Sequence, residues 1–90
     1  MFKILEELIA VIRKRKGSSV EESYTSKLLN NKKLSVEKVR EEIAELIDAI
    51  EKNTNKTHEA ADVLYHLMVL LEANGIKIED VMEELNKRKK

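Results

Sequence analysis

The sequence predicts an all-α fold, a compact bundle of four to five helices. Apolar residues recur at spacings of three and four along most of the 90 residues, and strand-like alternation is hard to find. Proline is absent, and each of the two glycines stands just after the end of a predicted helix. The length fits a single domain over residues 1–90. A chain this short often gains stability by oligomerising, so we expect a homodimer or a larger assembly.

The first helix is predicted from an apolar stripe that runs from Leu5 through Leu8 and Ile9 to Ile12. Basic residues fill positions 13–16, where cations complement the negative end of a helix dipole. A glycine then follows as a candidate C-terminal cap. The basic run has a second interpretation, as a wall of cations for a phosphate-rich ligand.

A short second helix is predicted to begin at Ser18 or Ser19, each followed three residues later by a glutamate, as in a capping box. Residues 30–33 are polar and indicate a turn. Ser23, Tyr24 and Thr25, with Lys27 close by, form a polar patch near the start of this helix. Hydroxyls, a helix N-terminus and a lysine suit a phosphate, although such residues also serve as ordinary caps and surface groups.

The third helix is predicted over residues 36–52, with Ser35 as its N-cap. The apolar residues at helical spacing are expected to form its core face: Val36, Val39, Ile43, Leu46, Ile47 and Ile50. A second stripe lies one residue back and borders the first: Lys38, Glu42, Glu45 and Ala49. Carboxylates on this stripe should lie at the rim of the core, whereas Glu41 is expected to face solvent.

Thr57 is the predicted cap of the fourth helix, which is expected to run to about residue 74, before a glycine. Between residues 63 and 71 the only polar side chains are those of Tyr65 and His66. A helix that is apolar nearly all round must be buried on most sides, so we predict a homodimer interface here. A fifth helix is predicted over residues 78–88.

Two acidic pairs carry the chemistry that the spacing suggests. Glu42 with Glu45, and Glu59 with Asp62, are each three residues apart and so are neighbours on a helix surface. If the two helices face each other, four carboxylates converge, and a hard divalent cation such as Mg²⁺ or Mn²⁺ would relieve their repulsion. The plainer interpretation is that glutamate-rich helices have solvated acidic faces.

His66 lies on the same stripe as Asp62, one turn further along. It could support the metal shell or contact phosphates of a ligand, or it could be a core-edge histidine paired with a carboxylate.

The composition excludes several classes of protein. The 17 basic and 17 acidic residues balance, which argues against general nucleic-acid binding. The absence of cysteine excludes disulfides and thiolate metal sites. The longest uncharged stretch is too short to cross a bilayer, and no secretory signal is visible. We expect a soluble cytoplasmic protein with no nucleic-acid or membrane partner.

The chain resembles the phosphoribosyl-ATP pyrophosphohydrolase family, within the all-α MazG-type pyrophosphohydrolases. Residues 23–29 are similar to the family's S-Y-T-x-K-L segment, and residues 38–45 to its K-V-G-E-E-x-x-E segment. Residues 59–67 are similar to its E-x-A-D-L-L-Y-H-L segment, and residues 84–88 to its closing E-L-x-x-R. Arg40 stands where the family often has glycine, which puts local substrate contacts in question.

The resemblance implies a Mg²⁺-dependent enzyme of histidine biosynthesis, which cleaves the α–β phosphoanhydride of phosphoribosyl-ATP to phosphoribosyl-AMP and pyrophosphate. On this interpretation the metals are held by Glu42, Glu45, Glu59 and Asp62. The catalytic carboxylates would be Glu41 and Glu42, with Glu41 the first candidate to orient or deprotonate water. The candidate substrate-binding residues are Arg15, Ser23, Tyr24, Thr25, Lys27, Lys38 and His66.

Two alternatives to this substrate stay open. A MazG-type enzyme could cleave a different nucleoside triphosphate, because the metal site is shared across the group and the base pocket cannot be identified from motifs. A helical interaction module without activity would show neither Mg²⁺ dependence nor pyrophosphate release.

Overall fold

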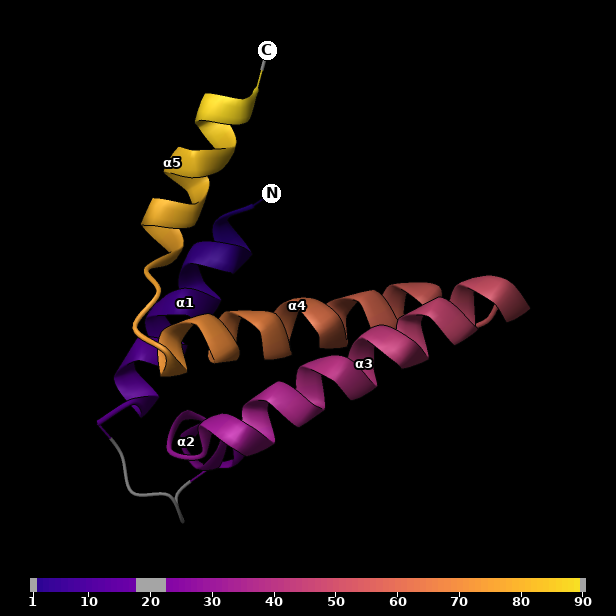
Figure 1. Cartoon of the computed structure of the whole chain (residues 1–90), viewed down its shortest axis with the longest axis horizontal. Helices are drawn as coiled ribbons and strands as arrows, with labels where there is room; N and C mark the ends of the chain where they lie inside the picture. The colour runs from indigo at the N-terminus through magenta and orange to yellow at the C-terminus, as the bar shows by residue number, and fades with distance from the viewer. Residues whose placement is uncertain (1, 18–22, 90) are drawn as a thin grey trace.

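A hairpin of two long helices forms the centre of the molecule. The computed structural model describes residues 2–17 and 23–89, which form five helices and no strand. Their bounds are α1 Lys3–Arg15, α2 Tyr24–Leu29, α3 Lys32–Lys52, α4 Lys56–Ala73 and α5 Ile78–Arg88. α3 and α4 pack against each other along most of their length, and this is the most extensive helix contact within the chain (Figure 1).

A three-residue turn makes α3 and α4 antiparallel. Asn53 and Asn55 take left-handed backbone conformations, with φ of 56° and 40°. Asparagine tolerates this region better than most residues, because its short side chain can bond locally. The amide of Thr54 then donates to the carbonyl of Ala49 at 2.9 Å and closes the end of α3. Such a short turn leaves little freedom in how the two helices face each other.

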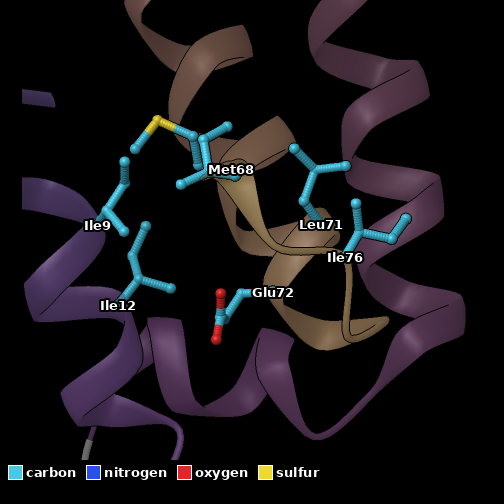
Figure 2. A pocket seen from close by; sticks show the side chains of 7 residues that line it. Ile9, Ile12, Met68, Leu71, Glu72 and Ile76 are labelled. Carbon is cyan, nitrogen blue, oxygen red and sulfur yellow. The ribbon is translucent and has the colours of Figure 1, made fainter. Parts of the chain in front are cut away.

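The apolar core lies at the other end of α4, where α1 and α2 pack against it. Its buried residues are Ile12, Leu28, Leu29, Met68, Val69 and Ala73. Figure 2 shows Ile9 and Ile12 facing Met68, with Leu71, Ile76 and the carboxylate of Glu72 beside them. The cavity between these side chains is about 10 Å³, which is room for roughly one water molecule. The side chains described here therefore form packed core.

Ion pairs join α1, α4 and α5 at the edge of this core. The guanidinium of Arg13 donates to both carboxylate oxygens of Glu79, at 2.8 and 2.6 Å, and its Nε donates to Glu72 at 3.4 Å. Lys16 lies 3.6 Å from the second oxygen of Glu72. The paired bonds to Glu79 have the forked geometry that arginine and carboxylate share. They fix α5, which has no fully buried residue of its own.

The predicted helix ends were right for α5 and wrong by a few residues for α3 and α4. α3 begins at Lys32, and its cap is Asn31, whose Oδ1 accepts the amide of Leu34 at 3.0 Å. The predicted cap, Ser35, is buried inside the helix. Asparagine and serine are about equally good N-caps, so the earlier of two competent residues starts the helix.

The first and fourth helices both end before a glycine, as predicted, but only Gly75 takes the left-handed conformation of a C-terminal cap. α4 starts at Lys56 with Asn55 in the cap position, two residues before the predicted cap Thr57, and it ends before Gly75, whose φ is +70°. α1 ends before Gly17, which does not adopt a positive φ. The predicted start of the second helix at Ser18 or Ser19 lies outside the described residues. The described α2 begins at Tyr24, after Ser23.

Within a single copy of the chain, the predicted core face of α3 is mostly not buried, so this prediction was wrong. Of its apolar stripe only Val39 is buried, and the residues that α3 buries are Ser35, Val39, Glu42 and Ala49. Large apolar side chains lie exposed on both helices of the hairpin: Ile43 (42%), Ile47 (52%), Ile50 (56%), Leu64 (51%) and Leu67 (38%). We call these five residues the apolar face. The stripe that contains Glu42 packs toward α4, so α3 is turned by about one residue from the predicted orientation.

Within the described residues, no helix is both long enough and apolar enough to cross a membrane. The cytoplasmic location expected from the sequence stays a prediction.

The bond between Arg13 and Glu79 predicts a loss of stability in acid. Arg13 lowers the pKa of Glu79 from 4.5 to about 2. A folded-state pKa below the unfolded value stabilises the fold above pH 4.5, and this contribution disappears as the pH falls toward 2. Urea unfolding at pH 7 and pH 3 should therefore show a smaller pH-dependent loss for Glu79→Gln than for the wild type. Glu83→Gln, on the same helix, is the matched control and should behave as the wild type.

Candidate active site

Three carboxylates meet where the middle of α3 faces the start of α4. Glu42 and Glu45 come from α3, and Glu59 comes from the first turn of α4. Each offers one oxygen, and the three oxygens lie within 4.8 Å of one another. The antiparallel hairpin produces this cluster, because it sets the acidic stripe of α3 against that of α4. Two of the three residues lie one helical turn apart, as their spacing predicted.

The cluster is partly desolvated and incompletely hydrogen-bonded. Glu42 is 9% exposed. Its Oε2 and the Oε2 of Glu59 are buried without a hydrogen-bond partner among the described residues. Burial raises the pKa of Glu42, and the nearby charge of Glu45 raises it further. Buried carboxylate oxygens without donors are unfavourable, so this donor set fits a hard cation with oxygen ligands.

Asp62, the fourth predicted metal ligand, lies in a neighbouring group. Its carboxylate shares a group with Glu59 and His58, whose ligand atoms also lie within 4.8 Å of one another. Nε2 of His58 is 3.4 Å from Oδ2 of Asp62. Glu59 belongs to both groups and links them. His58 is not among the predicted site residues, although its spacing of four residues from Asp62 is a signal that places the two on one helix face.

A depression of about 430 Å³ opens beside the cluster, a volume within the range of small-ligand sites. Its polar lining comes from both helices and the turn between them: Glu41, Glu45, Asp48, Thr54, Asn55 and Glu59. Glu41 is exposed, and its Oε2 accepts from Nζ of Lys38 at 3.4 Å. Glu41 therefore borders the depression but lies outside both groups of potential metal ligands.

His66 is buried and links α2 to the backbone of α4. Its Nδ1 lies 2.8 Å from the carbonyl oxygen of Asp62, and its Nε2 lies 3.2 Å from the hydroxyl of Tyr24. A carbonyl can only accept, so Nδ1 carries the proton and a neutral ring accepts from Tyr24 through Nε2. The rings of Tyr24 and Tyr65 both meet His66 edge-on, at centroid distances of 5.9 and 5.0 Å.

The hydroxyls of the predicted phosphate patch bond within the chain. Oγ of Ser23 accepts the amide of Ser26 at 3.0 Å and caps α2. The hydroxyl of Thr25 bonds to that of Tyr65, and Ser26 donates to the carbonyl of Arg15 at 3.2 Å. These bonds attach α2 to α1 and α4. They also orient Tyr24, whose pKa is raised by burial and lowered in part by Lys38.

The predicted cations occupy different positions relative to the cluster. Lys38 borders it, one turn before Glu42 and paired with Glu41. Arg15 and Lys27 are exposed at the ends of α1 and α2. The structure therefore brings Lys38, Tyr24 and His66 near the carboxylates, and leaves Arg15 and Lys27 on the surface around α2.

The comparison with protein families decides the assignment. A family model described as phosphoribosyl-ATP pyrophosphohydrolase matches residues 5–89. The chain belongs to this family. The match runs from α1 to the end of α5 and includes both acidic segments, so it confirms the resemblance drawn from the motifs.

Individual relatives of this family agree. The chain is 41% identical over 91 residues to the phosphoribosyl-ATP pyrophosphatase of Haloarcula marismortui, covering 96% of this chain and 93% of that protein. It is 44% identical over 91 residues to the enzyme of the same name from Clostridium novyi, covering 97% and 82%.

A longer relative matches too. The histidine biosynthesis bifunctional protein HisIE of Pyrococcus furiosus is 46% identical over 88 residues, which cover 97% of this chain and 42% of that protein. The chain thus spans less than half of this bifunctional relative.

The crowded carboxylates predict that an amide at position 42 stabilises the metal-free protein. In the folded chain the pKa of Glu42 is raised, so its ionised form destabilises the fold as the pH rises above the unfolded value of 4.5. Glu42→Gln removes this charge, and its amide can donate to Glu45. We expect urea unfolding in EDTA at pH 7.5 to show a gain of about 1 kcal/mol.

Glu41→Gln is the control for this measurement, because its side chain is exposed on the same helix. If Glu42→Gln in EDTA is no more stable than the wild type, burial and repulsion of the Glu42 carboxylate do not destabilise the metal-free fold.

Proposed function

We propose that this chain hydrolyses the α–β phosphoanhydride of phosphoribosyl-ATP with divalent cations held by Glu42, Glu45, Glu59 and Asp62. Its family makes it a pyrophosphohydrolase of phosphoribosyl-ATP in histidine biosynthesis. The observation that carries the residue assignment is the acidic cluster, in which Glu42 and Glu59 each have a buried oxygen without a partner. The products of this cleavage are phosphoribosyl-AMP and pyrophosphate.

The charges of the site and of the substrate call for Mg²⁺, with Mn²⁺ as the alternative. A triphosphate is strongly anionic, and so is the cluster, so the two repel unless cations lie between them. All-oxygen ligands suit these two ions. When bound, such a cation neutralises charge on the phosphate oxygens and lowers the pKa of attached water. The residues of the chain then have to hold the ions, place the phosphates and orient the attacking water.

Glu41 is our first candidate to orient or deprotonate the water, and Glu42 the second. Glu41 lines the depression yet lies outside both ligand groups, so its carboxylate stays available for a proton. The ammonium of Lys38 restrains Glu41 at 3.4 Å. Glu42 is more buried and lies inside the cluster, which suits a metal ligand better than a general base.

The phosphates and the sugar are proposed to lie between the cluster and α2. Lys38 pairs with Glu41, which lines the depression, and the Tyr24 hydroxyl bonds with Nε2 of His66. Arg15 and Lys27 are exposed and can meet the outer phosphates. Ser23 and Thr25 bond within the chain. We therefore propose that they hold α2 in position, in addition to any direct contact with the substrate.

A second copy of this chain is proposed to cover the apolar face. Ile43 follows Glu42 by one residue, and Leu67 follows His66 by one residue. Each is therefore turned by about 100° in the same sense from a residue that is buried in the hairpin. In two antiparallel helices this places both exposed stripes on one side of the pair. Two such hairpins would bury them in an isologous four-helix bundle.

The proposed dimer leaves the acidic cluster open. Glu45 follows Glu42 by three residues, so it is turned by about 60° in the sense opposite to Ile43. The depression beside Glu45 therefore faces away from the apolar face. Association would bury the exposed isoleucines and leucines while the substrate keeps its access.

Removing one proposed metal ligand should abolish most of the activity. For Glu45→Gln and Asp62→Asn we expect Mg²⁺-dependent release of pyrophosphate from phosphoribosyl-ATP to fall by about a hundredfold or more, with helical circular dichroism unchanged. Glu51→Gln, also exposed on α3, is the matched control and should retain activity. Full activity in both ligand variants would overturn the assignment.

The substrate is tested with the same assay on the wild type. Phosphoribosyl-ATP should be hydrolysed far faster than a panel of free nucleoside triphosphates. A preference for one of those triphosphates would favour a MazG-type enzyme of other specificity. Absence of pyrophosphate release from every compound would favour the interaction module.

A charge in the apolar face should dissociate the dimer. Ile47→Asp places a carboxylate in the middle of the proposed interface, and we expect sedimentation equilibrium to give a monomer mass where the wild type gives a dimer. Val11→Asp is the matched control, because Val11 is an apolar residue of α1 that is 48% exposed and lies outside this face. A monomeric wild type at micromolar concentration would refute the proposal.

A further inference from the structure

We propose that Tyr65 is a positioning residue, which fixes α2 and His66 so that the Tyr24 hydroxyl stays beside the acidic cluster. The inference rests on the proposed function, because it gives the Tyr24 hydroxyl a task toward the substrate. It adds a residue that belongs neither to the carboxylates nor to the predicted substrate contacts. Tyr65 acts through its neighbours, since its own hydroxyl is bonded to Thr25.

Tyr24 needs support from its neighbours, because its side chain has little packing of its own. The residue is 48% exposed, and it begins a helix of only six residues. Its hydroxyl is bonded to Nε2 of His66 at 3.2 Å. Burial raises the pKa of Tyr24, the charge of Lys38 lowers it in part, and that of Glu42 raises it. The hydroxyl therefore lies among the charged groups of the site.

Tyr65 supplies that support at two points. Its hydroxyl bonds to Oγ1 of Thr25, the residue next to Tyr24. Its ring meets the His66 ring edge-on, at a centroid distance of 5.0 Å and an interplanar angle of 84°, which is a favourable arrangement of two rings. Two neighbouring residues of α2 thus bond to two neighbouring residues of α4. This double attachment fixes both the position and the rotation of the short helix.

The apolar core holds Tyr65 in turn. Tyr65 is partly buried and packs against the core cluster, to which α1, α2 and α4 all contribute. Nδ1 of His66 lies 2.8 Å from the carbonyl oxygen of Asp62, so the second ring nitrogen is fixed as well. The described residues along the depression beside Glu45 do not include Tyr65. An effect of the Tyr65 hydroxyl on the reaction must therefore pass through α2 and His66.

The first test reads the His66 ring in the full chain without substrate. The ¹⁵N resonance of Nε2 reports whether the Tyr24 hydroxyl donates to it, and Tyr24→Phe gives the resonance for a lost bond. Tyr65→Phe keeps the aromatic ring and removes only the hydroxyl. We expect it to move the His66 resonance toward that of Tyr24→Phe. The exposed His58, the other histidine of the chain, is the internal reference.

The second test measures the kinetics of pyrophosphate release from phosphoribosyl-ATP. Tyr65→Phe should raise KM about tenfold and leave kcat almost unchanged, because a displaced Tyr24 weakens binding of the substrate and of the transition state equally. In a Thr25→Val background the same substitution should have no additional effect, since the bond is already absent. Ser26→Ala is the matched control, because it removes the bond of 3.2 Å that ties α2 to α1. It should change neither the His66 resonance nor KM.

The outcomes separate this inference from the proposed function. An unmoved His66 resonance in Tyr65→Phe would overturn the role of Tyr65, whatever the activity. Equal effects of Tyr65→Phe and Ser26→Ala would also overturn it, because any weakening of α2 would then suffice. A moved resonance with an unchanged KM would overturn the use of Tyr24 on the substrate.

If the resonance moves and the wild type releases no pyrophosphate from phosphoribosyl-ATP, the attachment of α2 through Tyr65 stands and the proposed function fails. Circular dichroism of each variant confirms that the helices are intact.

Discussion

The packing of α3 against α4 through a partly acidic strip is the constraint on which the rest of the structure depends. Glu42 is buried in this contact, opposite a helix that brings Glu59 to the same place. Desolvated carboxylates at this distance repel, so the strip contributes little to holding the helices together. Within the chain, the attachment comes from the turn at Asn53–Asn55 and from the apolar core at the far end of α4.

The smaller helices follow from that requirement. α1 and α2 bury the apolar side of α4 beyond the site, and α5 is fixed at the same end through Arg13 and Glu79 (Figure 1). All three helices leave the depression beside Glu45 uncovered. The bond between His66 and Tyr24 extends this anchoring to the edge of the cluster. The apolar core at one end of the hairpin thus positions the acidic cluster at the other end. This arrangement is common where function needs unfavourable charge.

The sequence could predict the helices and the acidic pairs, but not how the stripes are used. Period-3.6 patterns fixed the existence of all five helices, and competition between caps shifted the start of α3 from Ser35 to Asn31. On α3 two neighbouring stripes were both candidates for the contact with α4. Apolar character favoured that of Ile43, whereas the chain buries that of Glu42. A helical wheel shows which residues share a face, but it does not tell whether that face packs within one chain or against a second chain. The grouping of Asp62 with His58 required the relative placement of side chains.

The same ambiguity explains how one hairpin can serve two purposes. If the isoleucines of α3 faced α4, the acidic residues would turn to solvent, where separated carboxylates need no cation. Turning the helix by one residue puts Glu42 inside and leaves Ile43, Ile47 and Ile50 outside. Burial of charge at the site and exposure of an apolar surface are then one event, since both follow from a single rotation of α3. A protein built this way would gain from a second copy and from a bound cation together, because each compensates one half of that rotation.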